Sequence, residues 1–477
     1  MPLTDLSASA LSTAIASHAI SCRELMQATL ARIHALNPTH NAIVNLAPGD
    51  VLLTHADACD AELAQGHSRG WLHGVPVAIK DLSDAAGFPT TRGSPLLLDN
   101  WPARDGLMVS RMRAAGAIVI GKTNTPELGL GSHTFNVPFG ATRNAWDASR
   151  SAGGSSGGAA VALSLRMLPV ADGSDFMGSL RNPAGWNHVF GMRPSQGRVP
   201  ANNVPEAWVS QLGTEGPMAR SMEDLGRLLA TQSGHDAGAP LSMQSTLGVP
   251  AFANDAGAMR GLRIGWLGDL AGYLPMEPGV LDACRDALRH CEAAGAVVEE
   301  IPLGMDPAQL WECWLVWRRA LTGPRVDALL KLVPDARDHI KPEALWEYDQ
   351  SRQLPFSDFM QASQVRTAFY HHLRTLFAQW DVLALPSAQC WPFPVEQRWP
   401  QQVAGRTMDT YHRWMEVTIY ATLAGVPALC VPAGFHENGR WPMGLQLLAP
   451  MGADAKLLQV GAAYENLRSD FIALRPA

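Results

Sequence analysis

Two serines in glycine-containing segments and one lysine are the residues of this sequence best suited to chemistry. Ser155 lies in the run GGSSGG, Ser179 follows later in the run DFMGS, and Lys80 directly follows an apolar run at residues 75–79. A serine hydroxyl is a weak nucleophile and needs a base within hydrogen-bond reach. The two serines and the lysine therefore predict a hydrolytic site.

The GGSSGG run also has simpler interpretations. Glycines permit tight turns, and such a run is often only a turn. It is not a phosphate-binding loop, because no Lys-Ser or Lys-Thr pair follows at the required position. It matches the letters of a nucleophile elbow, but an elbow follows a strand, and residues 143–152 are polar and irregular. The structural prediction is a helix that begins here and continues through the apolar run at residues 159–165.

The segment that contains Ser179 is suited to stabilise negative charge. Residues 168–171 are typical of a strand, and they open into a loop at residues 172–179. Backbone N–H groups of such a loop can surround the oxyanion that forms when a serine attacks a carbonyl.

The base for this chemistry is a lysine or a histidine. His73, His133 and His188 lie near these motifs, so a Ser-His-Asp arrangement remains open, although none belongs to a recognisable triad motif. Lys80 can act only if its pKa falls from about 10.4 to near 7, which costs roughly 4 to 5 kcal/mol and which burial at a strand end can supply. The alternative is an ion pair with Asp81 or another carboxylate, and the residues alone favour neither interpretation.

The elements that must position these residues alternate between strands and helices. This pattern predicts an α/β architecture with much of the sheet parallel and covered on both faces. Ser21 and Glu24 predict a capping box for a first helix that ends at Asn37-Pro38. The expected strands are residues 75–79, 117–120, 168–171, 262–267, 296–301, 381–386, 426–432 and 444–448, and the other expected helices are 106–115, 280–294 and 453–467.

Residues 305–379 have a different, mainly helical texture. Trp311, Trp314 and Trp317 follow one another at three-residue intervals, a spacing more typical of a buried helix face than of a ligand pocket. Such a segment can still cover an active site. Since no linker or internal repeat interrupts the chain, we expect one domain.

Composition excludes several classes of protein. The 477 residues carry a net charge of −7 without any block of like charges, so no nucleic-acid or anionic-membrane surface is expected. The seven cysteines show no CxxC spacing, which argues against a disulfide framework and a zinc site and favours buried thiols. No signal peptide or membrane-spanning run is recognisable, and we expect a soluble cytoplasmic protein.

Several segments together resemble the amidase signature family, and the resemblance extends over nearly the whole chain. They are HGVPVAIKD at residues 73–81, GKTN at 121–124, RSAGGSSGG at 150–158, GSD through GSLR at 173–181, GVPA at 425–428 and GLQ at 444–446. The resemblance implies a single α/β/α domain over residues 1–477, with a large mixed β-sheet covered by helices on both faces. Residues 70–200 would form its catalytic core, and residues 305–379 a helical insertion over the substrate pocket.

The resemblance also assigns roles to individual residues. Ser179 would be the acylated nucleophile, Ser155 the relay serine with a cis peptide bond, Lys80 the base, and Ser156 a structural neighbour. The backbone N–H groups of Phe176, Met177, Gly178 and Ser179 would form the oxyanion hole. The side chains of Ser174, Asp175 and Arg181 would support the site. Gly129 and Leu130 would line the substrate pocket. No metal or organic cofactor is implied.

Some positions depart from the family pattern. Met177 stands where the family usually has glycine, which adds bulk and restricts φ near the acyl pocket. Phe176, Asn182 and Trp186 also depart from the commonest residues, so the substrate of a relative does not transfer to this chain. Ser174 replaces the usual threonine and keeps the hydroxyl.

The sequence thus predicts an amidohydrolase that cleaves a carboxamide C–N bond of a small molecule through an acyl-enzyme. The alternatives are a carbamate or ester hydrolase, the glutaminase subunit of a tRNA-dependent amidotransferase, and a catalytically silent binding relative. No nucleic-acid or membrane partner is expected, and a homodimer is left open.

Overall fold

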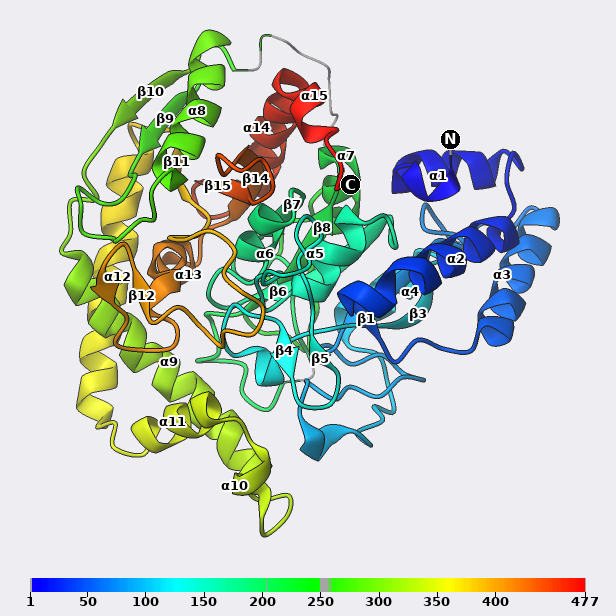
Figure 1. Cartoon of the computed structure of the whole chain (residues 1–477), viewed down its shortest axis with the longest axis horizontal. Helices are drawn as coiled ribbons and strands as arrows, with labels where there is room; N and C mark the ends of the chain where they lie inside the picture. The colour runs from blue at the N-terminus through cyan, green and yellow to red at the C-terminus, as the bar shows by residue number, and fades with distance from the viewer. Residues whose placement is uncertain (1, 203, 249–256, 258, 477) are drawn as a thin grey trace.

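A computed structural model describes residues 2–202, 204–248, 257 and 259–476, and one large sheet organises them (Figure 1). The sheet has eight strands in the order β10-β9-β11-β15-β14-β7-β8-β6. In this order the strands are β10 (Val297–Glu300), β9 (Arg263–Trp266), β11 (Val382–Pro386), β15 (Pro442–Leu448), β14 (Ala428–Phe435), β7 (Phe190–Arg193), β8 (Thr214–Ala219) and β6 (Val170–Asp175).

The expectation of a largely parallel sheet was wrong. Only β10 with β9, and β9 with β11, pair in parallel among these eight strands, and the other neighbours are antiparallel. The alternation of helices and strands in the sequence predicted the wrong strand directions, because several successive strands are joined without a helix between them. The segment between β14 and β15 is a short turn, and a short connection can join only antiparallel neighbours. The sheet is therefore mixed, as the family resemblance implied.

Helices cover the sheet on both faces. Successive residues of a strand point to opposite faces. On β14, Leu429 packs toward Gly461 of α14. The next residue, Cys430, points to the other face, where Gly444 of β15 lies between it and Gly185 of α6. The helices outside residues 305–379 are α1 (Ala8–Ala16), α2 (Cys22–His40), α3 (Gly49–Ala64), α4 (Leu107–Ala114), α5 (Gly157–Ser164), α6 (Arg181–Trp186), α7 (Met222–Gln232), α8 (Val280–Ala293), α13 (Ile419–Ala424), α14 (Asp454–Leu467) and α15 (Ser469–Ile472). Helices α7 and α8 both contact α14.

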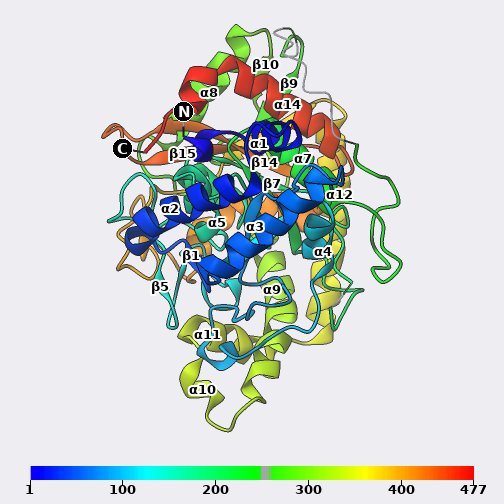
Figure 2. The same ribbon diagram turned by 90° about the vertical axis from the view of Figure 1, so that its right-hand side faces the viewer.

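A second, three-stranded sheet carries the lysine. Its order is β1 (Ile43–Val44), β3 (Ile118–Thr123) and β2 (Pro76–Lys80), with β2 and β3 parallel. Strand β2 lies beside β6, the edge of the large sheet. The N-terminal helices α2 and α3 cross the side of the molecule that Figure 2 shows.

Helix α5 begins in the GGSSGG run, as predicted. All of its residues are buried, as expected for a helix that is apolar on every side. Its first turn needs glycine, because a Cβ at Gly158 would lie 2.4 Å from the backbone nitrogen of Asn124 and 2.5 Å from the carbonyl oxygen of Ala42. The run is thus the start of a tightly enclosed helix.

The first helix shows one correct and one wrong boundary. The capping box is confirmed, since the Ser21 N–H donates to the Glu24 carboxylate at 2.8 Å and the Glu24 N–H to Ser21 Oγ at 3.0 Å. The helix does not stop at Asn37-Pro38 but continues to His40. Pro38 lies in the last turn, where its missing N–H removes a single helical hydrogen bond. Asn41, at φ 49°, ends the helix.

Residues 305–379 form an arm of helices along one side of the molecule (Figure 1). It comprises α9 (Pro307–Leu330), α10 (Ala336–His339), α11 (Pro342–Ser351) and α12 (Phe356–Phe377). The tryptophans at 311, 314 and 317 are all buried, as their spacing predicted. One cluster of buried hydrophobic residues extends from Ala8 to Tyr464 and includes part of this arm. Among the described helices, none is both long and apolar enough to cross a bilayer.

Candidate active site

Lys80 lies at the end of β2 with its side chain completely buried among hydroxyl groups. Its Nζ donates to Ser155 Oγ and Ser156 Oγ, both at 2.8 Å, and to Ser174 Oγ at 3.0 Å. Burial lowers the pKa of Lys80 to about 7, against the opposing charges of Asp172, Asp175 and Glu215. An amine with this pKa is partly neutral near pH 7 and can accept a proton.

Lys80 forms no ion pair with Asp81 or with another carboxylate of the described residues, so the ion-pair interpretation was wrong. The carboxylate of Asp81 instead faces Lys122 Nζ at 3.8 Å, from the neighbouring strand β3, and accepts the N–H of Thr91 at 3.1 Å. Successive residues at a strand end point in opposite directions, which separates Lys80 from Asp81. The side chain of Lys80 thus points toward the serines, and that of Asp81 points away from them.

Two acidic residues lie near Lys80. The Asp172 carboxylate accepts the backbone N–H of Lys80 at 3.1 Å, and burial raises the pKa of Asp172 to about 6. The Glu215 carboxylate accepts a hydrogen bond from the Ser83 hydroxyl at 2.5 Å, and burial raises the pKa of Glu215 to about 7. Their charges favour the protonated form of Lys80, so they act against the effect of its burial.

Ser155 and Ser156 directly precede α5, and Ser156 is its N-cap. The peptide bond between Gly154 and Ser155 is cis, the geometry implied by the family resemblance. The Ser155 carbonyl oxygen accepts a hydrogen bond from Thr125 Oγ1 at 3.0 Å. The backbone N–H of Ser156 donates to the carbonyl oxygen of Ser179 at 3.2 Å, so the two serine segments lie against each other.

Asp175 holds the loop that carries Ser179. Its carboxylate accepts the N–H groups of Gly178 at 2.9 Å and Leu180 at 3.2 Å, and it forms a buried ion pair with Arg181 at 2.9 Å. A second buried arginine, Arg193, lies 3.6 Å from the same carboxylate. Burial alone would raise the pKa of Asp175, but the two guanidinium groups and these N–H groups lower it to about 2. The loop is therefore anchored by a permanent negative charge.

The contacts of Asp175 reduce the number of backbone N–H groups available for the expected oxyanion hole. The Gly178 N–H is already donated to Asp175 Oδ1, which leaves the N–H groups of Phe176, Met177 and Ser179 as the candidate donors. Gly178 has φ 80°, and a Cβ there would lie 2.6 Å from Thr418 Cγ2. Only glycine fits this backbone position.

Helix α9 of the arm contacts the same loop. The ring of Phe176 tilts against Trp314 with 5.5 Å between ring centroids, and Met177 Sδ lies 4.0 Å from Arg318 Nη1. Arg318 is buried and pairs with both the Glu347 carboxylate and the Tyr411 hydroxyl. Met177 itself is buried. The methionine that replaces glycine thus fills space between the serine loop and the arm.

The two predicted pocket residues behave differently. A Cβ at Gly129 would lie 3.4 Å from Ser155 Oγ, so Gly129 borders the candidate relay serine. Leu130 is buried in a small apolar cluster with Val326 and Tyr411, and its carbonyl oxygen accepts a hydrogen bond from Lys341 Nζ at 2.5 Å. Gly129 is therefore the residue of the two that lies directly against the site.

The three histidines considered as bases are engaged elsewhere. His73 Nε2 contacts the Cys59 carbonyl oxygen, His133 lies between the Ser151 hydroxyl and the Val395 carbonyl oxygen, and His188 Nε2 contacts the Phe471 carbonyl oxygen. Burial lowers the pKa values of His133 and His188 to about 4. None of these contacts involves Ser155 or Ser179, so these histidines do not form the open Ser-His-Asp alternative.

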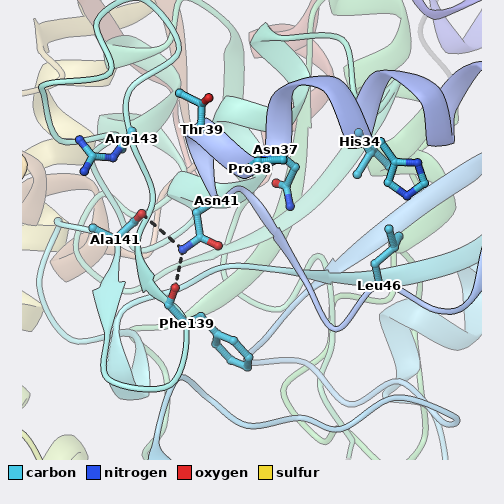
Figure 3. Close-up of a pocket in the computed structure, with 10 residues that line it drawn as sticks. His34, Asn37, Pro38, Thr39, Asn41, Leu46, Phe139, Ala141 and Arg143 are labelled. Atoms are coloured by element: carbon cyan, nitrogen blue, oxygen red, sulfur yellow. Dashed lines mark hydrogen bonds between the residues drawn. The ribbon is translucent and has the colours of Figure 1, made fainter.

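An open pocket of about 550 Å³ lies elsewhere, between the C-terminal end of α2 and the hairpin of β4 (Phe135–Asn136) and β5 (Gly140–Ala141) (Figure 3). The Asn41 side chain there donates to the carbonyl oxygen of Phe139 at 2.6 Å. None of the lysine or serine residues of the candidate site lines this pocket. This pocket is therefore separate from the candidate site.

Comparison with known proteins identifies the family. The family model for amidases matches residues 24–458. The chain belongs to the amidase signature family. Members of this family are hydrolases that act on C–N bonds, and the predicted family and fold class are thereby confirmed.

Relatives and solved structures cover the chain along its whole length. One glutamyl-tRNA(Gln) amidotransferase subunit from Chloroflexus aurantiacus is 34% identical over 490 residues, which cover 98% of this chain and 97% of the relative. An acylamidase of Rhodococcus erythropolis is 33% identical over 468 residues, covering 97% and 95%. The crystal structure of a bacterial aryl acylamidase of the same family matches with a TM-score of 0.92 at 28% identity, covering 100% of both chains.

Sequence reasoning missed several residues around the site. Asp172 and Glu215 became neighbours of Lys80 only through the packing of β2 against β6 and the pairing of β6 with β8. The Arg318–Glu347–Tyr411 contact joins three distant segments. For Lys122 a signal was present, since it ends an apolar strand as Lys80 does.

Proposed function

We propose that this amidase-family chain is a serine amidohydrolase in which Ser179 is the nucleophile, Ser155 the proton relay and Lys80 the base. The observation that carries the proposal is the environment of Lys80. A fully buried amine with a pKa near 7 donates to serine hydroxyls and makes no ion pair within the described residues. A lysine with a purely structural role would be expected to pair with a carboxylate.

The hydrogen bonds of Lys80 suit a base. A neutral amine has two N–H donors and one lone pair. Ser156 Oγ and Ser174 Oγ can accept the two N–H groups, which leaves the lone pair for the hydroxyl proton of Ser155. Ser155 Oγ would then be free to take the proton of Ser179.

The reaction would proceed through an acyl-enzyme. Ser179 Oγ forms a bond to the amide carbon while its proton passes through Ser155 to Lys80. The N–H groups of Phe176, Met177 and Ser179 would hold the oxyanion. The proton returns through Ser155 to the nitrogen, the C–N bond breaks, and water hydrolyses the ester to regenerate Ser179.

The names of two relatives favour a small linear amide as the substrate. An acylamidase and an aryl acylamidase match the chain over nearly its full length. We place the acyl pocket between Gly129 and the arm at residues 305–379, because both lie against the serine segments. We further propose one catalytic domain over residues 1–477 with its core at residues 70–200, working alone or as a homodimer. The buried free thiols suit a cytoplasmic location.

The second candidate is the glutaminase subunit of a tRNA-dependent amidotransferase, favoured by the identity to such subunits. The two candidates differ in substrate and in dependence on partner proteins. A panel of aryl and alkyl amides, carbamates, esters and glutamine, incubated with the purified chain alone, separates them. Release of amine from the amides with no ammonia from glutamine supports the amidohydrolase.

Other outcomes would overturn the proposal. Hydrolysis of glutamine in preference to the other amides would favour the amidotransferase role. Faster turnover of carbamates or esters than of amides would change the reaction class. If no substrate were turned over and a fluorophosphonate formed no adduct with the folded chain, the chain would be a silent binding relative.

A further inference from the structure

Two arginines near the candidate site pair with no carboxylate among the described residues. Arg325 lies on α9, and Arg92 lies in a turn between β2 and α4. Both are exposed, and neither guanidinium makes an ion pair or a hydrogen bond within the described part of the chain. By contrast, Arg318 on the same helix is buried and paired with Glu347.

Arg325 lies over the serine loop. Its guanidinium carbon is 6.0 Å from the centroid of the Phe176 ring, and that of Arg318 is 5.7 Å from the same ring. The two arginines are two helical turns apart and so share one face of α9. Phe176 begins the loop that ends at Ser179. Arg325 is thus held beside the loop of the proposed nucleophile.

The backbone of Arg92 is fixed next to the segment that contains Gly129. It has φ 53°, a left-handed conformation that non-glycine residues seldom adopt, and its carbonyl oxygen accepts the N–H of Leu128 at 2.8 Å. Leu128 is also left-handed, at φ 57°, and precedes Gly129, which borders Ser155 Oγ. Strained residues of this kind concentrate at functional sites.

The charges of two other arginines act on Arg325. Although Arg325 is accessible to solvent, the protein atoms crowded around its guanidinium, and then the charges of Arg92 and Arg318, lower its pKa. The charge of Arg318 is already matched by Glu347, whereas Arg92 and Arg325 make no ion pair within the described residues. Like charges in one place repel, and an anion between them would relieve the repulsion.

We propose that the substrate of this site carries a carboxylate, which Arg325 binds with help from Arg92. The proposal rests on the proposed amidohydrolase function and names the class of its substrate. A guanidinium matches a carboxylate with two parallel hydrogen bonds. The scissile amide would thereby be oriented toward Ser179 by a group that does not react.

Matched anilides test this proposal. One series pairs monoanilides of dicarboxylic acids of graded length with anilides of uncharged acids of equal length. A second pair, acetamidobenzoate and acetanilide, places the carboxylate on the leaving group instead. The measured quantity is kcat/KM for the charged substrate divided by that for its neutral match, from the amine released.

The wild-type chain should prefer the charged substrate over its neutral match either in the dicarboxylic series or in the acetamidobenzoate pair. Arg325→Gln should reduce this preference by about 10- to 100-fold, the loss expected for a charge-assisted hydrogen bond. Arg325→Lys should retain part of it, and Arg92→Gln should reduce it less than Arg325→Gln does. Arg285→Gln is the control, because Arg285 is a surface arginine on α8 paired with Glu300, and the preference should not change.

Failure of this inference is distinguishable from failure of the proposed function. If neutral and charged anilides were hydrolysed equally well at Ser179, or if Arg325→Gln kept the wild-type preference, the carboxylate proposal would be wrong and the amidohydrolase would stand. If neither series were hydrolysed and a neutral fluorophosphonate left Ser179 unlabelled, both would fall.

Discussion

The proposed chemistry rests on three residues, with Ser179 as the nucleophile, Ser155 as the proton relay and Lys80 as the base. The spacing of Lys80, Ser155 and Ser179 within recognisable segments was sufficient to select them, and the structure brings Lys80 to 2.8 Å from Ser155 Oγ. The partner of Asp81 could not be predicted, because it depends on the register between β2 and β3. The occupied N–H of Gly178 likewise depends on the side-chain position of Asp175.

The role of Lys80 can be tested by substitution. Lys80→Met keeps much of the volume and removes the base, so kcat/KM for an amide should fall by at least ~100-fold. Lys80→Arg should not restore activity, because a guanidinium stays protonated. Steady-state kinetics check this, with circular dichroism to establish that each variant folds. Near wild-type rates in either variant would require another base.

The pH profile gives a second test at this residue. The base acts in its neutral form, so kcat/KM should rise as pH increases through about 7, the pKa of Lys80, and level off above it. Glu215 raises that pKa by its charge, so Glu215→Gln should move the midpoint to lower pH. A profile that is flat between pH 5 and 9, or a midpoint that moves upward, would contradict the assignment.

At the scale of elements, the Asp175 carboxylate holds the loop after β6 in place. The sequence predicted a strand opening into a loop, but the strand continues to Asp175 and includes residues 172–175, which were assigned to the loop. The pairing of β6 with β8 extends it through Asp175, and such pairing cannot be deduced from local residue types. The sequence therefore predicted the presence of this strand correctly, but neither where it ends nor the direction in which it pairs.

Asp175→Asn should damage both stability and activity. It leaves Arg181 and Arg193 buried without their counter-charge, a change that typically costs about 3–5 kcal/mol of unfolding free energy. Denaturant unfolding measures the loss. Asp327→Asn is the matched control, since its partner Lys331 is an exposed helical neighbour and such pairs contribute less than about 0.5 kcal/mol. Equal effects of the two substitutions would show that Asp175 is not an anchor.

At the scale of the whole molecule, one core supports the site. The sequence showed no linker, and one large cluster of buried hydrophobic residues extends from Ala8 to Tyr464, beside a small second cluster around Leu130 and Val326. The order of the strands could not be predicted, because distant segments such as β6 and β14 meet in the same sheet. The placement of the arm against the serine loop also follows from long-range packing, through Trp314 and Phe176.

A large core shared by most of the chain predicts cooperative unfolding. Differential scanning calorimetry of the full chain should give one transition, with a calorimetric enthalpy close to the van't Hoff value. The arm at residues 305–379 should unfold with the rest, since Trp311 and Trp314 are part of the shared cluster. A separate transition that remains after the main one would show that the arm is an independent domain.

The central claim is that Ser179 is a nucleophile activated through Lys80, and covalent labelling tests it most directly. Incubation with a fluorophosphonate, followed by intact-mass measurement and peptide mapping, should give one adduct, on Ser179. Ser179→Ala should remain unlabelled, and Lys80→Met should be labelled at least ~100-fold more slowly. An adduct on another residue, or equal labelling rates with and without Lys80, would contradict the claim.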